Sequence, residues 1–330
     1  MVNNNDQRLD HTHPGSALKK DRRTRRAILT VDFEDYRRQE LRDHLGIPQP
    51  PNPVEVEKQF DMLIDLLSSC DVRATFYSVG RLTACLKATV WQRIAVRHRI
   101  GCHGYEHERV SKQGPAMFHE DTHAAKCALE DASGAPVVSY RAPYFSNDGC
   151  DPWFGEVLAK EGFRVDSSRR INASRLREIG DTFWVPGAEG STIEVPLPSV
   201  GVGAKRLTVI GGTYFRLLPL AVIRRLLERA EQDGFTPIVY LHPYDIDPTA
   251  PRLAYPRGRY WMRRGGAWIR RQGRETAGAK LRALSEIYNF EPVESVLSTS
   301  SESEKGGMSP AKSTPEQNQA PALLNSLIVS

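Results

Sequence analysis

Short apolar runs alternate with amphipathic segments along most of the chain, a pattern typical of strands that alternate with helices. Runs rich in β-branched and aromatic residues predict strands at 27–36, 73–79, 136–144, 163–168 and 236–243, with shorter strands at 100–103 and 192–196. Apolar residues at helical spacing predict helices at 54–69, 82–98, 115–131, 151–161 and 219–232. The pattern indicates one large α/β domain.

Polar segments flank this domain on both sides. Residues 1–26 end in a basic run and contain no apolar core of a secretory signal peptide, so they predict a disordered arm. Residues 293–330 are rich in Ser, Pro, Gln and Lys, which predicts a disordered tail. The catalytic domain is therefore expected at 27–292. We expect no transmembrane helix, because apolar residues nowhere run on for about eighteen positions.

Composition narrows the class of protein further. The chain has 330 residues, of which 40% are hydrophobic, and a formal net charge of +5. This mild bias does not indicate a nucleic-acid partner. Five cysteines are present with no closely spaced pair, which predicts free thiols in a reducing compartment and therefore a cytoplasmic protein.

Polar residues suited to catalysis follow the ends of the predicted strands. They are Asp32, Glu34, Asp35, His103, His107, Arg141, Asp166 and His242. The carboxyl ends of strands are where α/β folds build their sites. His103 and His107, four residues apart, can face one divalent ion, although such a pair alone fits two solvated histidines equally well.

A carboxylate beside the two histidines favours the metal site. Such a ligand set leaves positions for water and substrate, and the ion would polarise a carbonyl group. A second carboxylate can take the proton of the attacking water, and His242 can protonate the leaving group. We therefore expect hydrolytic chemistry at this rim.

Five motifs in this order resemble those of the polysaccharide deacetylases of carbohydrate esterase family 4. They are Thr30–Asp35, His103–His107, Arg141–Tyr144, Val165–Ser168 and Leu241–Pro243. The resemblance covers roughly residues 27 to 290 and implies a distorted (β/α) barrel of roughly seven or eight strands. Further stretches, at Gly211–Pro219 and His242–Pro248, resemble the branch associated with bacterial exopolysaccharide biosynthesis.

The resemblance also implies a role for each matching residue. Asp32 would be the general base, and Arg141 the cation that tethers it. His242 would be the general acid with Asp166 as its partner, and the backbone N–H of Tyr144 an oxyanion donor. His103 and His107 would be metal ligands, with zinc as the first choice and cobalt, nickel or manganese as alternatives.

The third metal ligand is open between two neighbouring residues. If the segment after Asp32 stays extended, Glu34 points to the same side as Asp32 and Asp35 points away. If the chain turns after Phe33, Asp35 swings inward instead. We favour Glu34 and keep Asp35 as the alternative.

The span 252–274 carries eight arginines and several aromatic residues, with no acidic residue. A solvated face is the simplest interpretation, but this composition also suits an anionic glycan, a lipid pyrophosphate or an anionic membrane surface. We expect Tyr214, Arg216 and Trp261 to bind substrate, and a peripheral membrane contact through this span.

The sequence thus predicts a metal-dependent hydrolase that removes N-acetyl groups from amino sugars of a bacterial polysaccharide or its lipid-linked precursor. A related hydrolase of formamides or cyclic imides is one alternative. A catalytically silent glycan-binding protein is another, although such a protein would not need the base, the acid and both metal histidines together.

Overall fold

The computed structural model describes residues 25–47, 50–202, 205–208, 211–251 and 268–298. The strands of the main sheet are β1 (Arg25–Phe33), β2 (Thr75–Ser78), β3 (Arg99–Cys102), β4 (Ser139–Tyr140), β5 (Val165–Asp166), β7 (Phe183–Trp184), β8 (Ile193–Glu194), β11 (Ile238–Leu241) and β12 (Tyr288–Glu291). A smaller sheet contains β6 (Arg170–Asn172), β9 (Leu197–Val202) and β10 (Lys205–Thr208).

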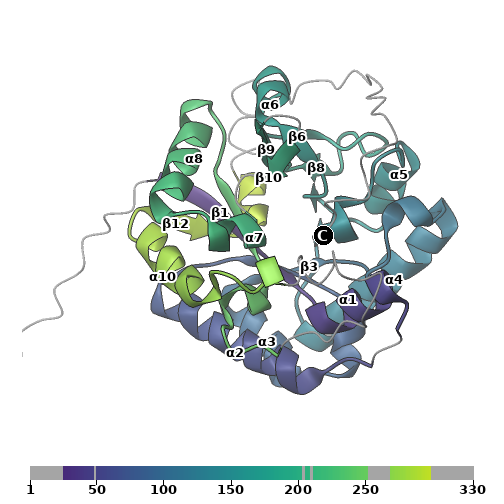
Figure 1. Cartoon of the computed structure of the whole chain (residues 1–330). Coiled ribbons are helices and arrows are strands. Elements are labelled where there is room, and N and C mark those ends of the chain that lie inside the picture. Colours follow the sequence, from purple (N-terminus) through teal and green to yellow (C-terminus); the bar gives the residue numbers. More distant parts are fainter. Residues whose placement is uncertain (1–24, 48–49, 203–204, 209–210, 252–267, 299–330) are drawn as a thin grey trace, which may run out of the picture.

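The helices lie around the outside of the main sheet (Figure 1). They are α1 (Tyr36–Leu45), α2 (Pro53–Ser69), α3 (Ala88–Arg97), α4 (Pro115–Ser133), α5 (Trp153–Lys160), α6 (Ala173–Ile179), α7 (Gly212–Leu217), α8 (Leu220–Gln232) and α10 (Arg274–Ser285). Short 3-10 turns are η1 (Gly80–Ala84), η2 (Val110–Lys112), η3 (Pro143–Phe145), η4 (Pro243–Ile246) and η5 (Val293–Ser295).

The main sheet runs in the order β11-β1-β2-β3-β4-β5-β8-β7, and β12 also pairs with β1. Its neighbours are parallel except for β7 and β8, which are antiparallel. The sheet curls into a partial barrel, which confirms the expected α/β fold. Because β1 has β11 on one side and β2 on the other, motifs far apart in the sequence meet at its carboxyl end.

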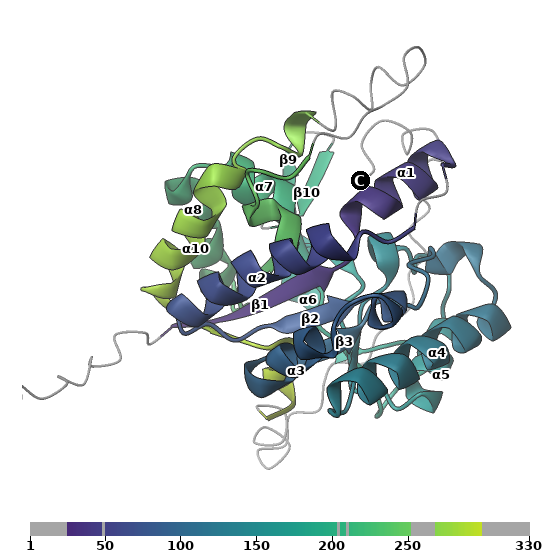
Figure 2. The same ribbon diagram turned by 90° about the horizontal axis from the view of Figure 1, so that it is seen from below.

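The core forms where β1 packs against the helices that follow it. β1 is buried from Ala27 onward, as expected for a central parallel strand with both faces covered. Phe33 contacts Phe60 of α2 and Trp91 of α3, with ring centroids 5.7 and 5.8 Å apart. Figure 2 shows α2 lying along β1. Each such side chain contributes roughly 2 kcal/mol through burial, and together they fix the strand that carries Asp32.

Several predicted boundaries differ from those observed. The first strand was expected to reach Tyr36, but β1 ends at Phe33 and α1 begins at Tyr36. The helix expected at 82–98 is divided into η1 and α3, and the strand expected at 136–144 shrinks to β4. The irregular segment 171–215 holds the small sheet, α6 and α7.

The packed part of the chain continues past the expected boundary at residue 292, because Val293 of η5 is buried in the core. Of the arm predicted over 1–26, Arg25 and Arg26 belong to β1 and the rest lies outside the described residues, as does the tail beyond 298. All five cysteines are free. None of the described helices is both long and apolar enough to cross a membrane.

Candidate active site

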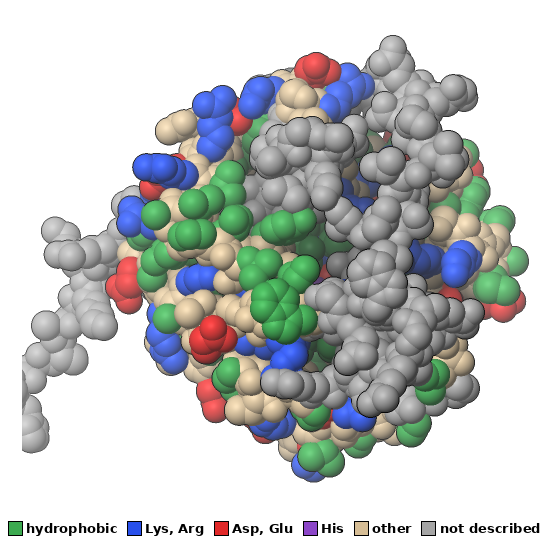
Figure 3. Space-filling model, in the orientation of Figure 1, with side chains coloured by type: hydrophobic (Ala, Val, Ile, Leu, Met, Phe, Trp, Pro, Cys, Tyr) green, Lys and Arg blue, Asp and Glu red, His purple; other side chains and the backbone are tan. Residues whose placement is uncertain are grey.

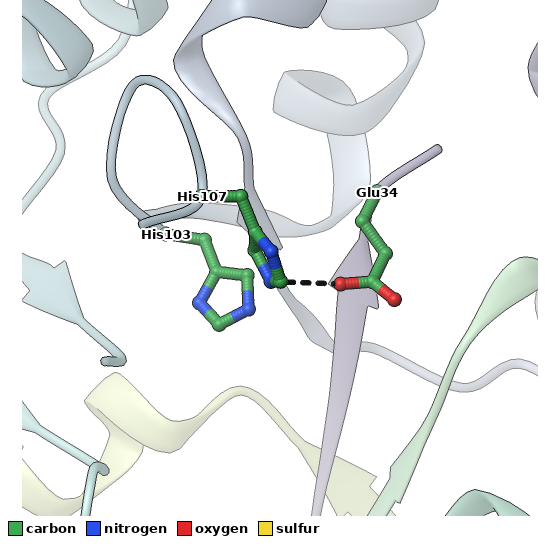
Figure 4. A group of neighbouring side chains, drawn as sticks. All are labelled: Glu34, His103 and His107. Carbon is green, nitrogen blue, oxygen red and sulfur yellow. Dashed lines mark ion pairs between the residues drawn. The ribbon is translucent and has the colours of Figure 1, made fainter. Parts of the chain in front are cut away.

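Glu34, His103 and His107 come together at the carboxyl ends of β1 and β3 (Figure 4). One ligand atom from each lies within 4.8 Å of the others, and all three side chains are buried. His107 Nε2 is 3.0 Å from Glu34 Oε2. Burial alone would raise the pKa of Glu34, but the neighbouring His107 brings it below its usual value. Glu34, His103 and His107 together, the metal group, have the composition of a site for zinc or a similar ion.

The hydrogen bond of His103 fixes its tautomer. His103 Nδ1 lies 2.7 Å from the backbone oxygen of Arg141, and a carbonyl oxygen only accepts, so Nδ1 carries the proton. Nε2 then keeps a lone pair, which is the state a metal ligand needs. Burial lowers the pKa of His103 to about 4 despite the nearby charge of Asp32, so the imidazole is neutral.

Asp32 lies beside this group in an ion pair with Arg141. Arg141 Nη1 donates to Asp32 Oδ1 at 2.7 Å and to Thr30 Oγ1 at 2.9 Å. Its other nitrogens donate to the backbone oxygen and the hydroxyl of Ser167. Burial alone would raise the pKa of Asp32, but the charge of Arg141 holds it below the usual range. Asp32 is therefore an ionised carboxylate with a fixed orientation.

His242 follows β11 and reaches toward the same space. Its Nε2 lies 3.7 Å from Glu34 Oε1 and 4.0 Å from Asp32 Oδ2. Its Nδ1 lies 3.1 Å from Asp245 Oδ2, and Asp245 also accepts from the backbone N–H of His242 at 2.8 Å. Burial opposes protonation, but the hydrogen bond and charge of Asp245 raise the pKa of His242 to about 9.

A buried arginine holds Asp245 in turn. Arg216 Nε donates to Asp245 Oδ1 at 2.7 Å, and both side chains are fully buried. Burial would raise the pKa of Asp245, but Arg216 and His242 lower it to about 2. Gly212 of α7 completes the arrangement, because a Cβ there would overlap Asp245 Oδ2. Arg216, Asp245 and His242 thus form a chain of polar contacts ending at the metal group.

The expected pairing of Asp166 with His242 is wrong. Asp166 lies on β5 and is fully buried opposite Glu194 of β8. Burial, followed by the charge of Glu194, raises its pKa well above the usual value and so favours the neutral acid. Its strand is four positions from β1 in the sheet, whereas β11 is adjacent to β1. Asp245 had a sequence signal that could have found it, since it follows His242 by three residues on one turn.

Asp35 is not part of the metal group. Its Oδ1 accepts from the backbone N–H of Arg38 and its Oδ2 from that of Asn52, at 3.0 and 2.8 Å. It is the N-cap of α1, and the chain turns after it rather than before it. The extended register that favoured Glu34 is therefore the one that the structure has.

Four expected site residues remain. Tyr144 lies at the site, with its ring centroid 4.6 Å from that of His107. Arg216 was expected to bind substrate, which is wrong, because its side chain is fully buried on Asp245. Tyr214 is half-buried on α7 and stays a prediction. Trp261 lies outside the described residues.

Comparisons with known proteins bear on this site. Residues 51–150 match the family model of the polysaccharide deacetylases, and residues 171–298 match a domain of unknown function, DUF3473. A candidate polysaccharide deacetylase from Mycobacterium smegmatis has a similar solved structure, with a TM-score of 0.57 and 18% identity over 90% of this chain and 96% of that one. Residues 51–150 are thus similar to the polysaccharide deacetylases, and the fold is shared with the solved structure over most of the chain.

Two curated relatives match shorter parts of the chain. The bifunctional xylanase/deacetylase of Pseudobutyrivibrio xylanivorans is 27% identical over 85 residues, which are 26% of this chain and 14% of the relative. YheN of Bacillus subtilis, a candidate polysaccharide deacetylase, is 30% identical over 102 residues, which are 31% and 36% of the two chains. The matched part of this chain thus covers 14% of the length of one relative and 36% of the other.

Proposed function

We propose that this deacetylase domain is a metal-dependent hydrolase that removes N-acetyl groups from amino sugars of a bacterial polysaccharide or its lipid-linked precursor. One observation carries the proposal. The ionised Asp32, the group Glu34, His103 and His107, and the protonated His242 meet at one end of β1. A glycan-binding protein without activity would have no need of all three functions in one place.

Glu34, His103 and His107 fit a divalent metal, since His103 has its lone pair on Nε2 and the three donors already face one another. When bound there, such an ion polarises the acetamide carbonyl and lowers the pKa of water. Zinc suits this set of nitrogen and oxygen donors best, with cobalt, nickel and manganese as alternatives.

Asp32 is placed to act as the general base. Its Oδ1 is held by Arg141, which leaves Oδ2, on the side of His242, to accept the proton of the attacking water. The fixed guanidinium keeps the carboxylate ionised and prevents it from rotating. As water adds to the acetamide carbon, the backbone N–H of Tyr144 donates to the oxygen that becomes negative.

His242 completes the reaction as the general acid. Its Nε2 proton passes to the nitrogen of the amino sugar as the carbon–nitrogen bond breaks, and acetate and a free amine leave. Asp245, bonded to Nδ1 and to the backbone N–H of the same histidine, fixes the ring so that Nε2 points into the site.

Acetate release tests the proposal. The zinc-loaded protein would be offered N-acetylglucosamine oligomers and lipid-linked N-acetyl sugars, beside Asp32→Asn and His103→Ala. Exposed residues away from the site supply matched controls, Asp61→Asn on α2 and His123→Ala on α4. We expect Asp32→Asn to keep its metal and lose at least about 100-fold in rate, and His103→Ala to lose both. An Asp32→Asn protein with full activity would contradict the proposal.

A further inference from the structure

We infer that the glycan carries negative charge close to the N-acetyl group, and that Arg109 and Arg170 bind it. This inference rests on the proposed function and names its substrate class. The two guanidinium groups lie over two consecutive aromatic rings, Tyr144 and Phe145, that border the candidate active site.

The turn that carries these rings has an unusual backbone. Tyr144 and Phe145 have φ angles of 59° and 52°, a left-handed conformation that residues with a Cβ rarely adopt. Two such residues in a row are held in place by their surroundings, and strain of this kind clusters where a site needs a particular geometry. The conformation sends both rings to the edge of the site.

The first ring joins Arg109 to the metal group. The ring centroid of Tyr144 lies 4.6 Å from that of His107 and 4.1 Å from the guanidinium carbon of Arg109. Arg109 is half-buried, and its neighbour Glu108 pairs with Arg42 at 3.4 Å rather than with it. A cation therefore lies one aromatic ring away from the candidate metal ligand.

The second ring joins Arg170 to the base and its tether. The Phe145 ring centroid lies 5.6 Å from the guanidinium carbon of Arg141 and 5.7 Å from the ring of Tyr240. The guanidinium carbon of the exposed Arg170, on β6, lies 5.3 Å from the same ring. A second cation is thus one aromatic ring away from Arg141, which holds Asp32.

These two arginines differ from the others that lie over rings. Within the described parts of the chain, neither has a carboxylate partner or a side-chain hydrogen bond to protein. The others pair with a carboxylate or donate to backbone carbonyl groups: Arg25, Arg81, Arg93, Arg141, Arg270 and Arg274. Arg109 and Arg170 therefore keep their donors available to a ligand at the rim.

Guanidinium groups bind carboxylates and phosphates through paired hydrogen bonds, and their planes are held in position by the rings beneath. Both anions occur on sugars, as uronates and as phosphate substituents. With an N-acetylated sugar at the metal group, an adjoining acidic sugar or phosphate would meet these arginines. A neutral glycan would leave both cations without a counter-charge.

The test compares three probes: a hexasaccharide of alternating N-acetylglucosamine and glucuronate, N-acetylglucosamine 1-phosphate, and neutral chitohexaose. Acetate release is measured on the zinc-loaded protein and on Arg109→Gln and Arg170→Gln. Binding is measured by calorimetry on Asp32→Asn, alone and combined with each of the two arginine substitutions. Arg93→Gln is the matched control, because Arg93 also lies over a ring, that of Phe60, but pairs with Asp61.

We expect Arg109→Gln and Arg170→Gln each to raise KM for one acidic probe about tenfold with kcat little changed. Neither should change the cleavage of chitohexaose. Arg93→Gln should behave as the wild type on all three probes. The acidic probe whose KM rises shows whether the arginines bind a uronate or a phosphate. Added salt should weaken the binding of the acidic probes more than that of chitohexaose. Equal cleavage of neutral and acidic probes by all variants would overturn the inference and leave deacetylation intact. Arginine-dependent binding without acetate release would support the inference and overturn the proposed function.

Discussion

His242 Nδ1 lies 3.1 Å from Asp245 Oδ2, so the candidate acid is oriented by a residue of its own turn. The buried Arg216 fixes that carboxylate from the other side. The residue expected to do this, Asp166, lies on β5 in a different part of the sheet. Substitution of Asp245 and substitution of Asp166 should therefore have different effects on deacetylation.

Asp245→Asn should reduce deacetylation about 100-fold, because the amide cannot hold the imidazolium as the carboxylate does. Hydrolysis of p-nitrophenyl acetate should fall much less, since that leaving group departs without a proton. Asp166→Asn is the matched control. It replaces a protonated acid with an amide of the same shape and should keep activity within a few-fold. Equal losses on both substrates in Asp245→Asn would mean that the residue only supports the fold.

Glu34→Gln should abolish stoichiometric zinc binding, because it removes the anionic oxygen of the group Glu34, His103 and His107. Asp35→Asn should bind zinc normally and lose about 1 kcal/mol of unfolding free energy, since an amide has one acceptor oxygen for the two backbone N–H groups that donate to Asp35. Metal content after dialysis and urea denaturation measure the two effects. Metal loss in Asp35→Asn, with metal kept in Glu34→Gln, would reverse the assignment of the third ligand.

Arg141→Gln should lower the unfolding free energy by roughly 3–5 kcal/mol, because Asp32 would remain buried without its cation. The double variant Arg141→Gln with Asp32→Asn should be more stable than Arg141→Gln alone, since no uncompensated charge is then buried. Urea denaturation of the single and double variants measures the coupling. Additive losses would show that the ion pair contributes little.

Stability should decline as the pH falls from about 6.5 toward 4, in part because of His98. This side chain is buried, its Nδ1 accepts from the backbone N–H of Ala74 at 3.2 Å, and burial, helped by Arg97, lowers its pKa to about 4. The unfolded chain takes up a proton near pH 6.5 while the folded chain does not. Below both pKa values of His98, the unfolding free energy is therefore lower by roughly 3 kcal/mol.

His98→Gln should flatten this pH dependence, measured by urea denaturation between pH 7.5 and 4.5 in the presence of a chelator. The chelator keeps metal binding out of the comparison. His123→Gln, an exposed histidine of α4, should leave the dependence unchanged. An identical pH profile in His98→Gln and the wild type would exclude His98 as the source.

The sequence predicted the presence of β1 to β5, β8 and β11, and the meeting of Glu34 with His103 and His107, because both depend on local features. An apolar run such as that before Asp32 is typical of a strand buried on both faces, and alternation along an extended chain puts Asp32 and Glu34 on one side. The start of α1 is not predicted, because its capping residue, Asp35, directly follows Glu34 and falls within the strand expected at 27–36. A cap is recognised only once the helix after it is known.

The strand pattern alone does not identify the partner of His242, because Asp166 and Asp245 are both carboxylates near strand ends. The spacing of three residues between His242 and Asp245 is a local signal for Asp245, whereas the exclusion of Asp166 needs the order of strands in the sheet. That order is a long-range property, set by which strands lie beside β1. Similarly, Arg216 resembled an exposed substrate contact in the sequence, but the carboxylate that accounts for its burial lies 29 residues away.

β1 pairs with β2, β11 and β12, and this arrangement has a consequence for how the chain folds during synthesis. Residues 51–150, which match the deacetylase family model, hold both histidines of the metal group but neither Asp32 nor His242. The residue proposed as the general acid reaches the proposed base only after the ribosome has released β11, more than 200 residues after β1. Contacts of such sequence separation form late and slowly. The two histidines of a nascent chain are thus synthesised long before the candidate site can be completed.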